Sequence, residues 1–184
     1  MNTRKFYELN IWIGREGQHE KKLWEIGHEW HYKVDDFFNH EKSAKPESLL
    51  QRPLKVIARR SDVRQDFAFC IFYPLIVSSR IRTVFEQYAI DDCEFYPVVI
   101  EHNNKIIDES YSAMRPIHLI NAADPVRSHM LEKTYINFKV DEARVPLQRR
   151  AFRVMQTGYN VVVDDVLRMS LGKLKPTGIE FRAV

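Results

Sequence analysis

The chain has 184 residues, a length typical of one domain. Hydrophobic residues make up 45% of it and charged residues 29%, proportions of a packed protein that exclude intrinsic disorder as a global description. The formal charge is only +3, from 28 Lys and Arg against 25 Asp and Glu. This balance disfavours a dedicated nucleic-acid binder, and equally an acidic mimic of nucleic acid.

No apolar run reaches the roughly 18 residues of a membrane span, and charges interrupt the first twenty residues, where a signal peptide would need an apolar centre. We therefore expect a cytoplasmic protein with no membrane contact. Cys70 and Cys93 both lie in apolar stretches, which favours core filling over a disulfide framework.

In chain order, residues 5–13 alternate with a period of two and predict a strand. Residues 14–53 mix aromatic and charged side chains without a sustained period, and we interpret them as a long aromatic-rich loop or decoration. The short apolar runs 54–58 and 66–72 predict two strands joined by a polar turn.

A helix is predicted from residue 78 or 79, where a serine can serve as the N-cap, because apolar residues then recur at helical spacing through Tyr88. Residues 93–101 predict a strand that Pro97 would place at a sheet edge. The turn at 102–104 should join it to residues 105–111 as a hairpin. Further strands are expected at 116–120, 134–140 and 152–155.

Residues 73–98 resemble residues 159–184 at an offset of 86, with six identities and agreement in kind at six further positions, among them the helix cap and the apolar helix positions. The pattern of both copies predicts a short extended segment, a polar helix cap, an amphipathic helix and a terminal strand. We therefore predict two similar helix-plus-strand units. Together with the other strands they indicate one α+β domain over residues 1–184, built mainly on antiparallel sheet.

Three residues near the N-terminus, His28, His31 and Asp35, would share one face of a helix and are the strongest metal-site candidates. The segment has no clean helical period, and the spacing of its histidines differs from the zinc-protease motif. A metal-dependent hydrolase using these residues is kept as an alternative. The first choice is no metal and no cofactor.

Nucleophilic chemistry is disfavoured for Ser78 and Ser79, although they lie between a predicted strand and helix. No glycine flanks them, and Asp164 and Asp165 occupy the equivalent positions in the second unit, so helix capping explains both pairs. The sequence also has no glycine-rich phosphate loop. No catalytic residue is therefore assigned.

The C-terminal third is the most basic region, with 11 Lys and Arg and 6 Asp and Glu between residues 127 and 184. Arg149, Arg150 and Arg153 cluster within it. Such groups are compatible with a solvated face, with contact to an acidic partner, or with phosphate binding.

Three segments carry a resemblance to a known family: Tyr73 to Arg82 with Glu94 to Val98, Ile120 to Ser128, and Val163 to Val184 with its Thr-Gly-Ile-Glu-Phe ending. Over roughly residues 54–184 the chain resembles bacterial immunity proteins of the immunity protein 11 type, which accompany secreted polymorphic toxins. The resemblance implies an α+β fold, a protein toxin as partner, and no catalytic residues.

This resemblance makes an antitoxin that binds and blocks a cognate toxin the first hypothesis. The alternatives are the hydrolase above, acting on a toxin's product or as a toxin itself, and a structural or regulatory domain of a secretion system. Aromatic side chains outside the periodic pattern are either a lid on the core or interface anchors. The candidate partner-binding residues are Trp24, Trp30, Tyr32, Phe37, Phe38, Arg149, Arg150 and Arg153.

Overall fold

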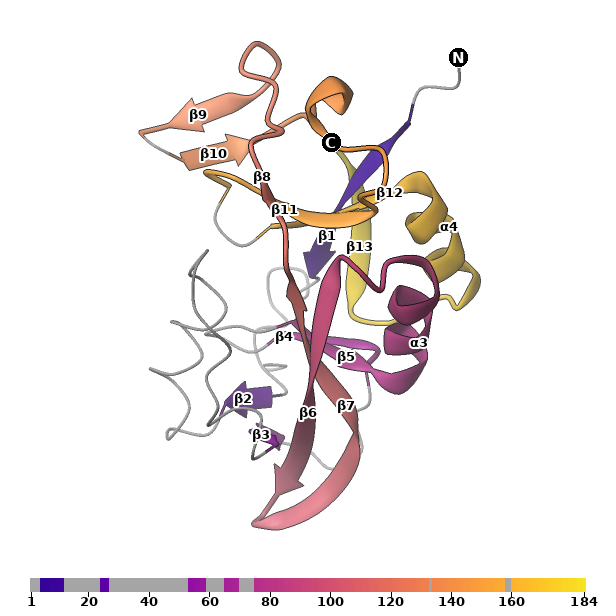
Figure 1. Cartoon of the computed structure of the whole chain (residues 1–184). Helices are drawn as coiled ribbons and strands as arrows, with labels where there is room; N and C mark the ends of the chain where they lie inside the picture. The colour runs from indigo at the N-terminus through magenta and orange to yellow at the C-terminus, as the bar shows by residue number, and fades with distance from the viewer. Residues whose placement is uncertain are drawn as a thin grey trace.

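The computed structural model describes residues 4–11, 24–26, 53–58, 65–69, 75–132, 134–157 and 160–184. These ranges form two mixed sheets, a separate hairpin and two α-helices, α3 (Ser79–Tyr88) and α4 (Asp165–Lys173) (Figure 1). A short 3-10 helix, η3 (Glu142–Arg144), follows the hairpin. The α+β class predicted from the sequence is confirmed.

The larger sheet has six strands in the order β2 (Trp24–Ile26), β3 (Leu54–Ala58), β6 (Cys93–His102), β7 (Lys105–Pro116), β5 (Leu75–Ser78) and β4 (Phe67–Phe69). The second has the order β13 (Ile179–Ala183), β1 (Phe6–Ile11), β12 (Val161–Asp164), β11 (Ala151–Val154) and β8 (Leu119–Ile120). The hairpin joins β9 (His129–Leu131) and β10 (Thr134–Asn137). Neighbouring strands are antiparallel except in the pairs β3–β6 and β8–β11.

Most predicted strands occur, with shifted ends. The runs 5–13, 54–58 and 66–72 contain β1, β3 and β4, and β11 coincides with 152–155 to within one residue at each end. Residues 134–140 form a strand only through Asn137, after which Val140 makes an isolated bridge. Pro116 ends β7 rather than beginning a strand. Within the segment 14–53, β2 adds a short strand to what was predicted to be a loop.

The β6–β7 hairpin turns as predicted, because Asn103 and Asn104 take positive φ values of 49° and 60°, which asparagine tolerates well. The edge position predicted from Pro97 is wrong, since β6 lies between β3 and β7. The pairing with β3 begins one residue later, at Val98 opposite Leu54. Pro97, which has no backbone N–H to donate, therefore lies just before the first residue pair of the β3–β6 ladder.

Helix α3 buries the face predicted for it, with Ile81 and Phe85 fully buried. Ser78 occupies the N-cap position, but its hydroxyl makes no cap bond and instead donates to Asp66, at 2.9 Å. Side-chain capping by Ser78 is therefore a wrong prediction. In α4 the cap is present, because the Asp164 carboxylate accepts the backbone N–H of Leu167 at 2.8 Å.

The two units have the same order of strand, helix and strand, and the elements begin at 75, 79 and 93 in one and at 161, 165 and 179 in the other. Each start differs by the predicted offset of 86. In each unit a third, antiparallel strand lies between the other two: β7 separates β5 from β6, and β1 separates β12 from β13. Descent of both units from a duplication stays a prediction.

Arg82 and Arg168, which the offset of 86 aligns, lie beside phenylalanines that the same offset aligns. The Arg82 guanidinium lies 5.5 Å from the centre of the Phe95 ring, and that of Arg168 lies 6.0 Å from the centre of the Phe181 ring. Arg82 also pairs with Glu86 one turn along the helix, at 2.7 Å.

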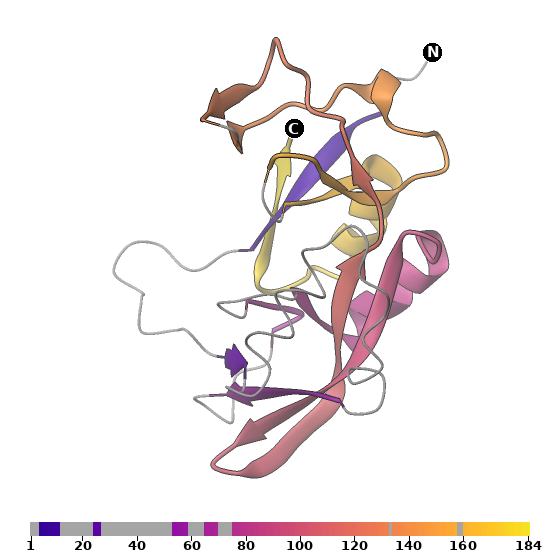
Figure 2. The same cartoon turned by 60° about the vertical axis from the view of Figure 1, so that its left-hand side comes forward.

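The two helices lie side by side on one side of the molecule, as Figures 1 and 2 show. Ile81 and Phe85 of α3 belong to the same buried cluster as Leu167 and Leu171 of α4. Strand residues of both sheets complete this cluster. A core shared in this way supports the proposal that the chain is a single domain.

Asp66, a buried residue just before β4, connects the two units through its carboxylate. It accepts the Nε–H of Arg80 at 2.5 Å and, from the turn after α4, the backbone N–H of Thr177 at 2.9 Å. Gly178 follows with φ +83°, where an added Cβ would lie 2.1 Å from the Phe67 carbonyl oxygen. The Thr-Gly pair of the terminal motif therefore makes a close junction that a larger residue would disrupt.

Acid should weaken this junction. Burial alone would raise the pKa of the Asp66 carboxyl, but hydrogen bonds from Arg80 and Thr177 lower it to about 2, against 3.8 ordinarily. The pKa of Asp66 is lower in the folded protein than in the unfolded chain. The ionised carboxylate therefore stabilises the fold above pH 4, and this contribution is lost as the pH falls towards 2. We expect Asp66→Asn to lower the free energy of unfolding by roughly 2–4 kcal/mol at pH 7 in urea titrations.

The difference in unfolding free energy between wild type and Asp66→Asn should narrow between pH 4 and pH 2.5, because the carboxyl of the unfolded wild-type chain takes up a proton in that range before the folded one does. A gap of the same size at pH 7 and pH 2.5 would contradict this assignment.

Candidate partner-binding site

Most of the aromatic candidates lie outside the described residues: Trp30, Tyr32, Phe37 and Phe38, together with the metal-site alternative His28, His31 and Asp35. Trp24 is described in its backbone, as the first residue of β2 opposite Ala58. Among the residues that the structure does describe, no cluster of His, Cys, Asp or Glu could hold a metal ion.

The three arginine candidates separate into two environments. Arg149 and Arg153 line one pocket of about 490 Å³. Arg150 does not line it; its guanidinium pairs with Asp164, at 3.1 Å, beside the start of α4. The structure therefore brings two of the three predicted arginines together and assigns the third an internal ion pair.

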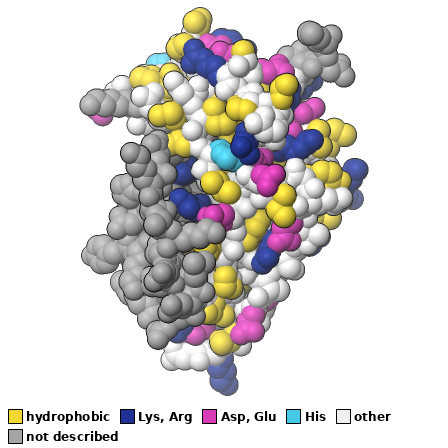
Figure 3. Space-filling model, viewed as in Figure 1, with side chains coloured by type: hydrophobic (Ala, Val, Ile, Leu, Met, Phe, Trp, Pro, Cys, Tyr) yellow, Lys and Arg dark blue, Asp and Glu magenta, His cyan; other side chains and the backbone are white. Residues whose placement is uncertain are grey.

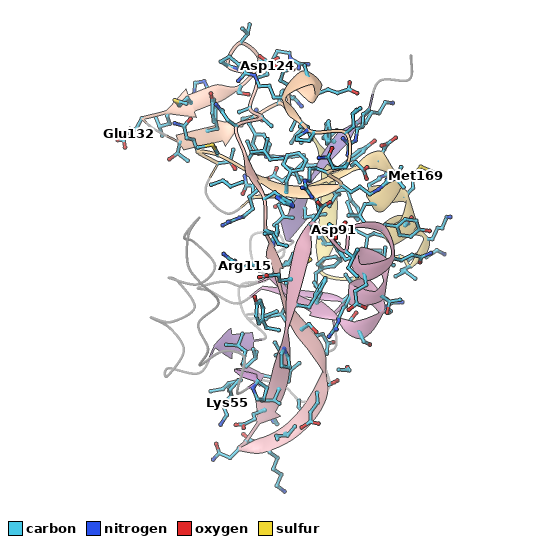
Figure 4. The ribbon with its side chains drawn as sticks, viewed as in Figure 1. Lys55, Asp91, Arg115, Asp124, Glu132 and Met169 are labelled. Atoms are coloured by element: carbon cyan, nitrogen blue, oxygen red, sulfur yellow. The ribbon has the colours of Figure 1, made fainter. Side chains whose placement is uncertain are left out.

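The pocket lies where the two sheets meet. Arg115 comes from the end of β7 in the larger sheet (labelled in Figure 4), Arg153 comes from β11 in the second sheet, and the loop between η3 and β11 supplies Arg149. The described lining residues are Arg115, Ile117, His118, Leu119, Ile120, Pro146, Gln148, Arg149 and Arg153. Arg115 and His118 were not predicted, because nothing in the sequence links them to arginines more than thirty positions away.

Strand pairing sets the position of two of these groups. Arg115 lies directly opposite Glu94 across the β6–β7 ladder, and its guanidinium contacts the Glu94 carboxylate at 3.2 Å. Arg153 lies opposite Leu119 in the parallel pair β8–β11, and its backbone N–H donates to the carbonyl of His118 at 2.8 Å. The two sheets thus each present an arginine to the same cavity.

A buried carboxylate, Asp92, positions the third arginine from the turn after α3. It accepts the backbone N–H groups of Arg150 and Ala151 at 2.7 and 3.1 Å and contacts the Arg149 guanidinium at 3.1 Å. The neighbouring carbonyl of Asp91 accepts the Nε2–H of His118, at 2.9 Å. This turn therefore orients both Arg149 and His118 towards the pocket.

The charged groups that line the described part of the pocket are cationic. None of the described lining residues is acidic, and Glu94 and Asp92 contact the arginines from outside the lining. Burial, and next a hydrogen bond to Glu94, raise the pKa of Tyr96, so that its hydroxyl stays protonated and donates to that carboxylate. Guanidinium groups arranged in this way suit a carboxylate or a phosphate.

The described lining of the pocket contains no Ser, Cys, Asp or Glu. Cys93 is buried next to Asp92, and burial raises the pKa of its thiol, which keeps it protonated. The predicted core-filling role is thus confirmed for Cys93, whereas Cys70 lies outside the described residues.

The segment around Asp124, one of those carrying the family resemblance, is a structural turn. The Asp124 carboxylate accepts the backbone N–H groups of Val126 and Arg127 at 2.9 and 3.1 Å. The Ser128 hydroxyl accepts the backbone N–H of Lys139 at 2.9 Å, which ties the turn to the segment that follows β10. This motif, like the Thr-Gly junction, holds the fold together.

The fold and the pocket thus define an α+β protein with a cavity lined by arginines. The model of the immunity protein family Imm11 matches residues 5–184, and the chain belongs to this family. No curated protein matches it. Neither α3 nor α4, the helices of the described ranges, is long and apolar enough to cross a bilayer.

Loss of the Asp92 charge should weaken the contacts that hold Arg149 and the start of β11 beside the pocket. We expect Asp92→Asn to lower the free energy of unfolding by roughly 2–4 kcal/mol, because three donors lose a charged acceptor. Asp91→Asn is the matched control, since the Asp91 side chain is exposed and its backbone carbonyl makes the contacts. Equal urea midpoints for the two variants would contradict the role given to Asp92.

Proposed function

We propose that this protein is the immunity partner of a secreted bacterial toxin in a polymorphic toxin system, and that it acts in the cytoplasm by binding and blocking that toxin. Family membership across residues 5–184 is the observation that carries the proposal. The producing cell needs such a protein because the toxin is made in the same compartment before its export.

Two structural observations favour binding over catalysis. The described lining of the arginine pocket offers cations and apolar side chains, which recognise a partner, rather than a nucleophile with its base. The segments that carry the family resemblance are occupied by turns, caps and a helix-to-strand junction. We therefore infer that the family's shared residues maintain the fold and that a surface performs the function.

The proposed surface has two parts. One is the pocket that Arg149 and Arg153 line. The other is the aromatic segment 14–53, with Trp24, Trp30 and their aromatic neighbours. Arg150 is the weakest of the proposed contact residues, because its guanidinium is engaged by Asp164.

Capture from the native cell tests the function directly. The tagged protein should retain one partner in a fixed ratio, that partner should arrest growth when it is expressed alone, and co-expression of this protein should restore growth. A captured partner that is harmless by itself would contradict the proposal. Zinc retained through purification, with growth protection that depends on it, would instead support the hydrolase alternative.

The aromatic segment can be tested with Trp24→Ala and Trp30→Ala made singly. A tryptophan that covers the core should cost about 3–5 kcal/mol of folding stability, whereas an interface anchor should cost 2 kcal/mol or more of toxin affinity with stability nearly unchanged. Urea denaturation and titration calorimetry separate the two results. If both variants keep normal stability and affinity, the segment belongs to neither class and the pocket is the surface that remains.

A further inference from the structure

We propose that the arginine pocket receives the side-chain carboxylate of an Asp or Glu residue of the toxin, and that apolar residues beside that carboxylate pack on the rim of the pocket. This inference rests on the proposed function and specifies the chemistry of its contact surface. The arginine pocket is the cavity lined by Arg115, His118, Arg149 and Arg153 with their apolar neighbours.

The geometry of the cations favours one buried anion. Arg115 comes from β7, Arg149 from the loop before β11 and Arg153 from β11, and all three line a single cavity. Arg115 and Arg153 are buried, so water competes weakly for a group that reaches them, and the five N–H donors of a guanidinium allow it to keep one partner, as Arg115 keeps Glu94, while it donates to another. In such a place a carboxylate gains more from a guanidinium than it would on an open surface.

Apolar side chains in the lining, and next to it or its contacts in the chain, are exposed. Ile117 lines the cavity and is 41% exposed, and Leu147, between the lining residues Pro146 and Gln148, is 88% exposed. Ile90 is 65% exposed and precedes Asp91, whose carbonyl accepts bonds from both His118 and Arg149. Aliphatic side chains exposed around a charged pocket are typical of a protein interface, where they exclude water from the central contact.

A nucleic acid is the less suitable occupant. Phosphate chains are bound by a stripe of cations, whereas the view in Figure 3 shows dark-blue, magenta and yellow side chains interspersed on this face. The formal charge of the whole chain, +3, supplies no strong general attraction for polyanions. A protein carrying an acidic residue among apolar ones matches both the pocket and its rim.

A capped peptide tests the pocket without the toxin. Acetyl-Leu-Glu-Leu-amide should shift the arginine Nε–Hε resonances of the pocket saturably in NMR titrations, at millimolar concentration. The uncharged acetyl-Leu-Gln-Leu-amide should bind at least tenfold more weakly, and Arg149→Gln should remove the difference. Equal binding of the two peptides would overturn the proposal. So would inorganic phosphate that binds the pocket more tightly than the Glu peptide, because it would identify a phosphate site.

The captured toxin provides the second measurement. Arg149→Gln should weaken toxin affinity at least tenfold, and Leu147→Ser, a change at an exposed position, should weaken it several-fold with an unchanged melting temperature. Arg127→Gln is the matched control, since Arg127 is exposed and pairs with Asp124 in a turn outside the pocket. It should bind as the wild type does.

The outcomes distinguish a failure of the pocket proposal from a failure of the proposed function. If the wild type binds its toxin while Arg149→Gln and Leu147→Ser bind equally well, the pocket proposal is overturned and the proposed function stands. If the wild type neutralises no toxin, the proposed function fails, and the peptide titration still decides whether the pocket binds a carboxylate.

Discussion

Helix α3 is tied to the second half of the molecule by a buried carboxylate near each of its ends. Near its start, Asp66 accepts bonds from Arg80 on the helix and from Thr177 after α4. Beyond its end, Asp92 accepts the backbone N–H groups at the beginning of β11. The apolar contact between α3 and α4 is non-directional, so these charge-assisted bonds are what select one alignment of the two units.

The arginine pocket depends on the same joint. β7 belongs to the larger sheet and β8, which follows it, belongs to the second, so the chain itself crosses from one sheet to the other beside the cavity. Asp92 then holds Arg149 at that crossing, and Asp91 holds His118. The groups that connect the sheets therefore also orient the cations, and a change in these contacts would alter the pocket.

Residues in and around the segments that carry the family resemblance have structural roles here. Thr177 bonds to Asp66, Gly178 approaches the Phe67 carbonyl too closely for any side chain, and Asp124 closes a turn. These contacts specify a shared scaffold. They do not by themselves specify a partner.

Local order was determined by the sequence itself. The apolar spacing of α3, the Asn103–Asn104 turn and the matching starts of the two units were all predictable, because periodicity and turn chemistry act within a few neighbouring residues. Tertiary structure alone decided that β1 lies between β12 and β13, that Ser78 bonds to Asp66 and that Arg115 shares a cavity with Arg149. Backbone hydrogen bonds can join any two strands, and a side chain can pair with any group that folding brings near. Such partners are chosen by the packing of the whole chain, which no local pattern encodes.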